Sequence, residues 1–88
     1  EAIGSTDAYL SAQIDKLLSN LGNMTGHEIA SKLQNIQDDI LERKGYSGIL
    51  RQIRMGITPL KDNFNILSPP ERQELINKIS FWRSKLNI

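Results

Sequence analysis

The single histidine of this 88-residue chain, His27, is the first residue whose side chain could do chemistry. A histidine that accepts a phosphoryl group would have to lie mid-helix on a solvent face beside a lysine. A serine–histidine triad needs a placement that sequence alone does not define. His27 instead lies between Thr25 and Glu28, and the pattern Thr25-Gly26-His27-Glu28 is typical of a helix capping box. We therefore expect a structural role for His27.

The acidic residues do not form a pair suited to acid–base catalysis. Asp38 and Asp39 are adjacent, so their side chains would point about 100° apart on a helix, whereas paired-carboxylate catalysis needs two carboxyl groups in one pocket. No phosphate-binding glycine loop or nucleophile elbow occurs. The chain has no cysteine and one histidine, which excludes thiolate and multi-histidine metal sites. The sequence thus predicts no enzymatic activity, no cofactor and no metal.

The basic residues are more informative, because they concentrate in the second half of the chain. Residues 1–44 carry seven acidic residues (Asp or Glu) and four basic ones (Lys or Arg), a net charge of −3. Residues 45–88 carry three acidic and seven basic residues, a net charge of +4. The overall charge of +1 argues against nucleic-acid binding, which needs a clear basic excess. The basic half favours an acidic, partly apolar peptide as partner, and scattered solvated charge is the alternative. The predicted partner-binding residues are Arg51, Arg54, Lys61, Lys78 and Arg83.

The first half of the chain predicts two amphipathic helices that would position these residues. One runs from about residue 6 to about residue 21, with a cap at Ser5 or Thr6, and Gly22 is expected to end it in a left-handed conformation. The other begins at the Thr25 capping box and stops at Gly45, a length of about 19 residues. Apolar residues recur at helical spacing in both stretches: Leu10, Ile14, Leu17 and Leu21 in the first, and Ile29, Leu33, Ile36 and Ile40 in the second.

Residues 46–67 predict two short helices rather than one. Ser47 is a candidate cap for the first, and Gly56 marks an expected break. Thr58 then resembles a new cap, with Pro59 at the first helical position. A single kinked helix is the alternative, which Pro59 disfavours because proline removes a donor and clashes one turn back.

The stretch from Ser68 to Leu86 has the clearest helix signature in the sequence. Ser68 can cap a helix that begins with two prolines, and Glu71 completes a capping box. Apolar residues then form one face: Leu75, Ile79, Trp82 and Leu86. Trp82 is predicted to be a core residue. Phe81 cannot lie on the same helix face as Trp82, so it either fills a neighbouring seam between helices or is an exposed contact residue.

These patterns predict an all-α fold. No stretch shows the period-two alternation of strands, and the connections are short. We therefore expect a compact bundle of four to five helices with mostly antiparallel neighbours, organised as a flexible N-terminus over residues 1–5 and a single helical-bundle domain over residues 6–88. No apolar run has the length of a membrane span, so we expect no membrane span. The lack of cysteine is compatible with an intracellular location, which we expect.

Two segments of the second half are similar to the N-terminal domain of transcription elongation factor TFIIS, a helical bundle also called the LW domain. Ile53-Arg54-Met55-Gly56-Ile57 resembles the apolar–glycine turn between that family's third and fourth helices. The segment from Ile79 to Leu86, ISFWRSKL, resembles its closing signature around a tryptophan. The resemblance implies docking of short acidic-hydrophobic motifs from transcription partners, with Arg54, Lys61 and Lys78 as contact positions, no catalysis and a nuclear location.

The sequence therefore predicts a non-enzymatic protein-interaction module. Such a module would dock a short acidic-hydrophobic motif or helix of a partner, and the resemblance implies a role in transcription elongation. The alternative is a self-associating or scaffold segment of a larger helical adaptor in trafficking or the cytoskeleton. The oligomeric state and the identity of the partner stay open.

Overall fold

Four α-helices make up most of residues 5–88, the part of the chain that the computed structural model describes, with side chains from residue 8 onward. The helices are α1 (Ser5–Asn20), α2 (Gly26–Lys44), α3 (Gly48–Ile57) and α4 (Pro69–Leu86). Two 3-10 turns follow α1 and α3: η1 (Leu21–Asn23) and η2 (Thr58–Leu60). Within residues 5–88 no strand forms, and Thr25 and Ile66 make an isolated bridge. The predicted all-α bundle is confirmed.

Side-chain caps start three of these helices at the predicted residues. Thr25 and Ser68 each form a full capping box, with Glu28 and Glu71 respectively, and the Ser47 hydroxyl accepts a hydrogen bond at the start of α3. The expected cap at Ser5 or Thr6 falls on side chains outside the described part of the structure. Residues 1–4 of the expected flexible N-terminus also lie outside it.

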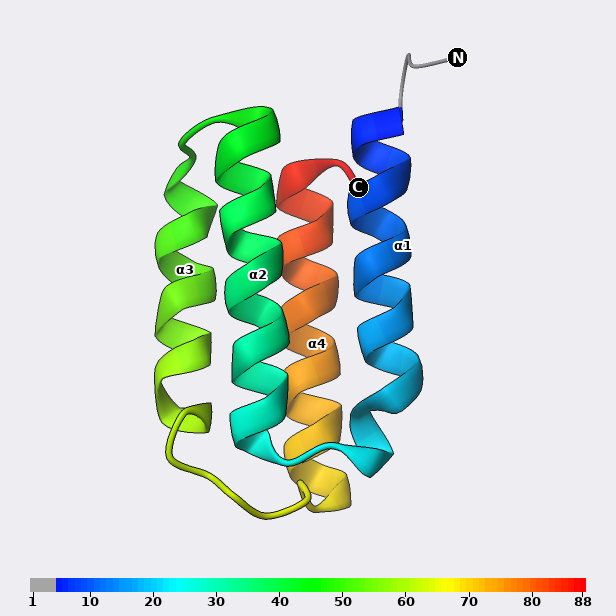
Figure 1. The fold of residues 1–88 in the computed structure, drawn as a ribbon, viewed down its shortest axis with the longest axis vertical. Helices are drawn as coiled ribbons and strands as arrows, with labels where there is room; N and C mark the ends of the chain where they lie inside the picture. Colours follow the sequence, from blue (N-terminus) through cyan, green and yellow to red (C-terminus); the bar gives the residue numbers. More distant parts are fainter. Residues whose placement is uncertain (1–4) are drawn as a thin grey trace.

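The helices alternate in direction along the bundle. In Figure 1 the helices follow one another across the view as α3, α2, α4 and α1, and α4 lies partly behind α2. Helix α2 packs against both α1 and α3, and α3 packs against α4. Each helix runs opposite to the one before it (Figure 1), as the short connections predict. No helix in residues 5–88 is long and apolar enough to cross a membrane.

A single apolar core fills the space between the helices. Trp82, which is 6% exposed, belongs to it, so the predicted core position is confirmed. Gln37 is the one buried polar residue in the described core, and its Nε2 donates to the Leu50 carbonyl oxygen at 3.3 Å, which ties α2 to α3. The buried apolar residues include the predicted stripes: Leu10, Ile14, Leu17, Leu21, Ile29, Ala30, Leu33, Ile36, Ile40, Ile49, Leu50, Ile53, Ile57, Leu67, Leu75, Ile79, Trp82 and Leu86.

Two glycines behave differently from the prediction. The predicted left-handed conformation of Gly22 is wrong: Gly45 is the described glycine with positive φ, and α1 continues into the 3-10 turn η1. The break predicted near Gly56 comes one residue later, because α3 runs through Gly56 and ends at Ile57. A β-carbon at Gly56 would lie 2.8 Å from the Trp82 ring, so glycine there permits close helix packing.

The second predicted short helix, from Thr58 toward Leu67, is reduced to the single turn η2. The chain beyond it bonds to the start of α2 instead: the Asn65 carbonyl accepts from the Gly26 N–H at 3.1 Å, and the Asn63 carbonyl from the His27 N–H at 2.6 Å. These N–H groups have no partner within their own helix, so the loop satisfies them. The loop gains these bonds only by leaving the helical conformation.

Candidate functional site

His27 holds this loop in place. Its Nδ1 donates to the Lys61 carbonyl oxygen at 2.8 Å, and its ring stacks on Phe64 with 4.7 Å between centroids. Its side chain therefore has a structural contact, which agrees with the role expected for it. Across residues 5–88, no group of three or more His, Cys, Asp or Glu side chains is arranged to hold a metal ion.

The five predicted partner-binding residues do not form one patch. Arg51 and Arg54 are exposed on α3, and Lys61 is exposed in the turn after η2. Lys78 lines a groove between α3 and α4. Arg83 is five residues further along α4, a rotation of about 140° from Lys78 around the helix axis. Lys78 and Arg83 therefore lie on different sides of α4.

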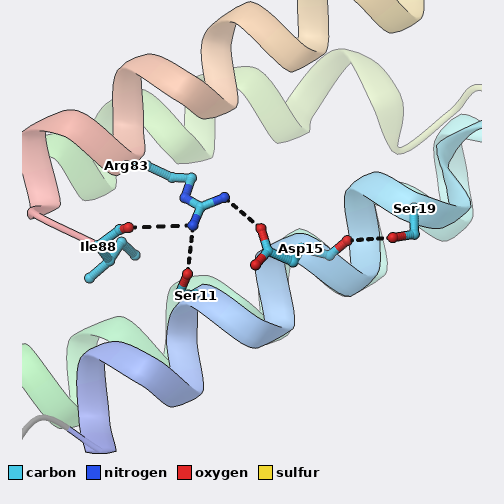
Figure 2. A network of polar contacts seen from close by, with 5 residues as sticks. All are labelled: Ser11, Asp15, Ser19, Arg83 and Ile88. Atoms are coloured by element: carbon cyan, nitrogen blue, oxygen red, sulfur yellow. Dashed lines mark hydrogen bonds and ion pairs between the residues drawn. The ribbon is translucent and has the colours of Figure 1, made fainter.

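Arg83 is bonded to α1 rather than available to a partner. Figure 2 shows its guanidinium between the two helices: Nη1 pairs with Asp15 Oδ1 at 2.7 Å, and Nη2 donates to the Ser11 hydroxyl. Nη2 also donates to the Ile88 carbonyl oxygen at 3.4 Å. Through these contacts the Arg83 side chain links α4 to α1 and to the last residue of the chain.

The groove between α3 and α4 has an apolar floor. Trp82, which is buried, lies against Gly56, and both residues line the groove. Because Trp82 also belongs to the core, its position is fixed by the packing of the whole bundle. The floor is therefore rigid and preformed.

The walls of this groove carry two large apolar side chains that the core does not use. Met55 on α3 is 60% exposed and Phe81 on α4 is 52% exposed, and both line the groove. Gln52 and Asn77 add amide groups that can bond to a peptide backbone. Met55 was not among the predicted site residues, and Phe81 was predicted only as either a residue that fills a neighbouring seam or an exposed contact residue. The sequence did contain a sign of both residues: each is a large apolar residue that lies outside the buried stripe of its own helix.

The groove continues along the seam toward the start of α4. A second hollow shares Gly56, Glu74 and Lys78 with the first and extends to Leu60 and Glu71. From Glu71 to Phe81 the seam is about 15 Å long at 1.5 Å per residue. It can accommodate about three turns of helix or four to five extended residues.

Charge changes sign along the groove. At one end the Lys85 ammonium lies over the Phe81 ring, 5.4 Å from its centroid. Lys78 and Glu74 are one turn apart on α4 and line both hollows, whereas Glu71, at the start of α4, lines only the second. The Glu71 carboxylate accepts from the Ser68 backbone N–H at 2.8 Å, and bonds from the Ser68 backbone and hydroxyl lower the pKa of this carboxyl below its usual 4.5. The basic end is therefore the one that suits an acidic group.

Comparison with protein-family models, with curated proteins and with solved structures gives no match for this chain.

Proposed function

We propose that this protein is a non-enzymatic docking module that binds a short acidic-hydrophobic segment of a partner protein in the α3–α4 groove. The observation that carries the proposal is the pair of exposed apolar side chains, Met55 and Phe81, on either side of a floor made by Trp82. Large apolar side chains that are exposed to solvent beside a preformed pocket are typical of peptide-binding grooves.

The charge gradient defines how the segment would lie. Its apolar side chains would cover Met55, Phe81 and the Trp82 edge, and its acidic group would lie at the Lys78 and Lys85 end. Toward the start of α4, Glu71 and Glu74 would repel a second acidic group. The groove thus favours a segment whose acidic residues are at one end.

A role in transcription elongation, and with it a nuclear location, is the part of the proposal that rests on the resemblance to the TFIIS N-terminal domain. Of the three positions to which that resemblance assigns contacts, Lys78 lines the groove, whereas Arg54 and Lys61 do not. The docking proposal itself rests on the groove and does not need the resemblance.

Selection from a displayed library of random peptides tests the proposal. We expect the enriched peptides to combine large apolar residues with acidic residues toward one end. Trp82 is the only tryptophan, so a shift in its fluorescence emission provides the affinity of each synthetic peptide. Met55→Ser and Phe81→Ser should each weaken binding by about tenfold or more, as loss of a central apolar contact does. Selection of basic peptides, or of none, would contradict the proposal.

Matched variants elsewhere on the surface distinguish specific docking from non-specific hydrophobic binding. Tyr46 is 76% exposed and Leu41 is 49% exposed, and neither lines the groove. Tyr46→Ser and Leu41→Ser should leave peptide affinity unchanged. The scaffold alternative makes a different prediction: sedimentation would show a dimer that forms with rising concentration and is insensitive to Met55→Ser and Phe81→Ser.

A further inference from the structure

A second cleft lies between α1 and α2 and shares no lining residue with the α3–α4 groove. Its apolar lining is formed by Leu17 and Ile36, which are buried, and by Met24, which is half-buried. The cleft encloses about 390 Å³. Small-molecule sites in proteins span roughly 300–1,000 Å³ and have this kind of apolar lining. The cleft is therefore large enough for a small ligand.

The mouth of the cleft carries a basic residue on each wall. Lys16 comes from α1 and Lys32 from α2, and both are exposed. Within residues 8–88, neither ammonium group forms an ion pair or a hydrogen bond with another side chain. The polar lining is completed by amide side chains, those of Gln13, Asn20, Asn23 and Asn35.

The single acidic residue of the lining, Asp39, does not neutralise these lysines. Its Oδ2 accepts from the Tyr9 hydroxyl at 3.4 Å, and the Arg43 guanidinium lies 4.3 Å from the centroid of the Tyr9 ring. The Tyr9 hydroxyl thus already donates to Asp39, and the Tyr9 ring carries the Arg43 cation. The opposing lysines leave the mouth of the cleft with a net positive charge over an apolar floor.

We infer that the α1–α2 cleft binds a small amphipathic anion. The apolar body of the ligand would cover Leu17, Met24 and Ile36, and its anionic group, a carboxylate or an equivalent, would lie between Lys16 and Lys32. Charge-assisted bonds from two lysines and burial of the apolar body would each contribute to affinity. This site is independent of the proposed docking groove, and its ligand would act on a different face of the bundle.

Titration of the whole chain with decanoate tests the inference, and decanol provides a match without the charge. Two-dimensional amide NMR should show saturable shifts at Leu17, Lys32 and Ile36 with decanoate. Decanol should bind about tenfold more weakly or worse, because it lacks the anionic group. Raised salt should weaken the binding of decanoate and leave that of decanol unchanged, and this readout needs no variant.

The lysine variants provide the second readout. Lys16→Gln with Lys32→Gln should weaken decanoate binding by about tenfold or more. Lys78→Gln with Lys85→Gln, the matched pair at the α3–α4 groove, should leave it unchanged. All four side chains are exposed, so both double variants should melt like the parent protein.

Three results would overturn the inference. They are equal binding of decanol and decanoate, decanoate binding that survives loss of Lys16 and Lys32, and shifts confined to the α3–α4 groove. An anionic membrane lipid is also an amphipathic anion, so the cleft could bind a lipid surface instead of a free ligand. Sedimentation with phosphatidylglycerol vesicles tests this alternative. Vesicle binding that depends on Lys16 and Lys32 without binding of free decanoate would assign the cleft to a membrane surface and contradict a soluble ligand.

Discussion

The ring of Trp82 rests on the backbone of Gly56, so closely that a β-carbon at residue 56 would lie 2.8 Å from both Cη2 and Cζ2 of the indole. This contact joins α3 to α4 and forms the floor of the docking groove at the same time. The same glycine therefore serves both the packing of the bundle and the shape of its candidate site.

Gly56→Ala should destabilise the protein. Replacing a glycine inside a helix by alanine normally adds about 0.5–1 kcal/mol of stability. Here the added methyl group would force the indole or α3 to move, which we expect to cost about 1–3 kcal/mol, the usual range for overpacking a core. Urea unfolding measures the change.

Gly48→Ala is the matched control in the same helix. A β-carbon at Gly48 has no atom within 4 Å, and the residue does not have positive φ. This variant should be neutral or more stable by about 0.4–1 kcal/mol. Equal behaviour of the two alanine variants would mean that the Trp82 contact does not constrain Gly56.

Trp82→Ala should cost about 3–5 kcal/mol, as large-to-small changes in a packed core do. Trp82 is 6% exposed and its neighbour Phe81 is 52% exposed, so Phe81→Ala should change stability by a small fraction of that amount. Thermal and urea melts of both variants provide the comparison. Melting of Trp82→Ala near the parent value would show that the tryptophan is a surface contact.

The Arg83–Asp15 pair should contribute modestly to stability. Its side chains are 24% and 63% exposed, so solvent screens the 2.7 Å contact. A double-mutant cycle with Arg83→Ala and Asp15→Ala should give a coupling free energy of about 0.5–1 kcal/mol at low salt, and less at high salt. Absence of any coupling would mean that the contact does not hold α1 to α4 in solution.

The Glu71 carboxylate should make stability depend on pH. Bonds from the Ser68 backbone N–H and then its hydroxyl lower the pKa of Glu71 below 4.5 in the folded state. A lowered pKa stabilises the fold above the unfolded-state value, and this contribution is lost as pH falls through the folded-state pKa. The parent should therefore lose more stability between about pH 5 and about pH 3 than Glu71→Gln does. Glu74→Gln, with no such cap bond, is the control and should follow the parent, and parallel curves for parent and Glu71→Gln would contradict the assignment.

The sequence predicts the helices well where local signals and burial agree. The capping boxes at Thr25 and Ser68 and the apolar stripes that follow them set α2 and α4 at the predicted residues. Local chemistry alone decides such starts, because the cap, the first turn and the buried face are close in sequence.

The sequence fails where a distant partner decides the structure. Gly56 is typical of a break when read locally, and only the Trp82 ring, which lies on another helix, explains a glycine inside α3. Likewise, the predicted helix after Thr58 is lost because Asn63 and Asn65 bond to the N-terminus of α2. Neither contact has a signal within its own segment.

The candidate site shows the same division. Lys78 was predicted from composition and lies in the groove, but composition could not show that Arg83 turns toward Asp15 on α1. The apolar walls, Met55 and Phe81, depend on two helices meeting at one seam. Charge can be read from a sequence, whereas the direction in which each charge points requires the packed structure.

Two-dimensional amide NMR of the labelled chain with an enriched acidic-hydrophobic peptide tests the central claim most directly. The docking proposal predicts the largest shifts along the α3–α4 seam, at Met55, Gly56, Lys78 and Phe81, with a change at the Trp82 indole N–H. Shifts confined to the α1–α2 cleft, or to Leu41 on α2 and Tyr46 in the α2–α3 connection, would contradict it.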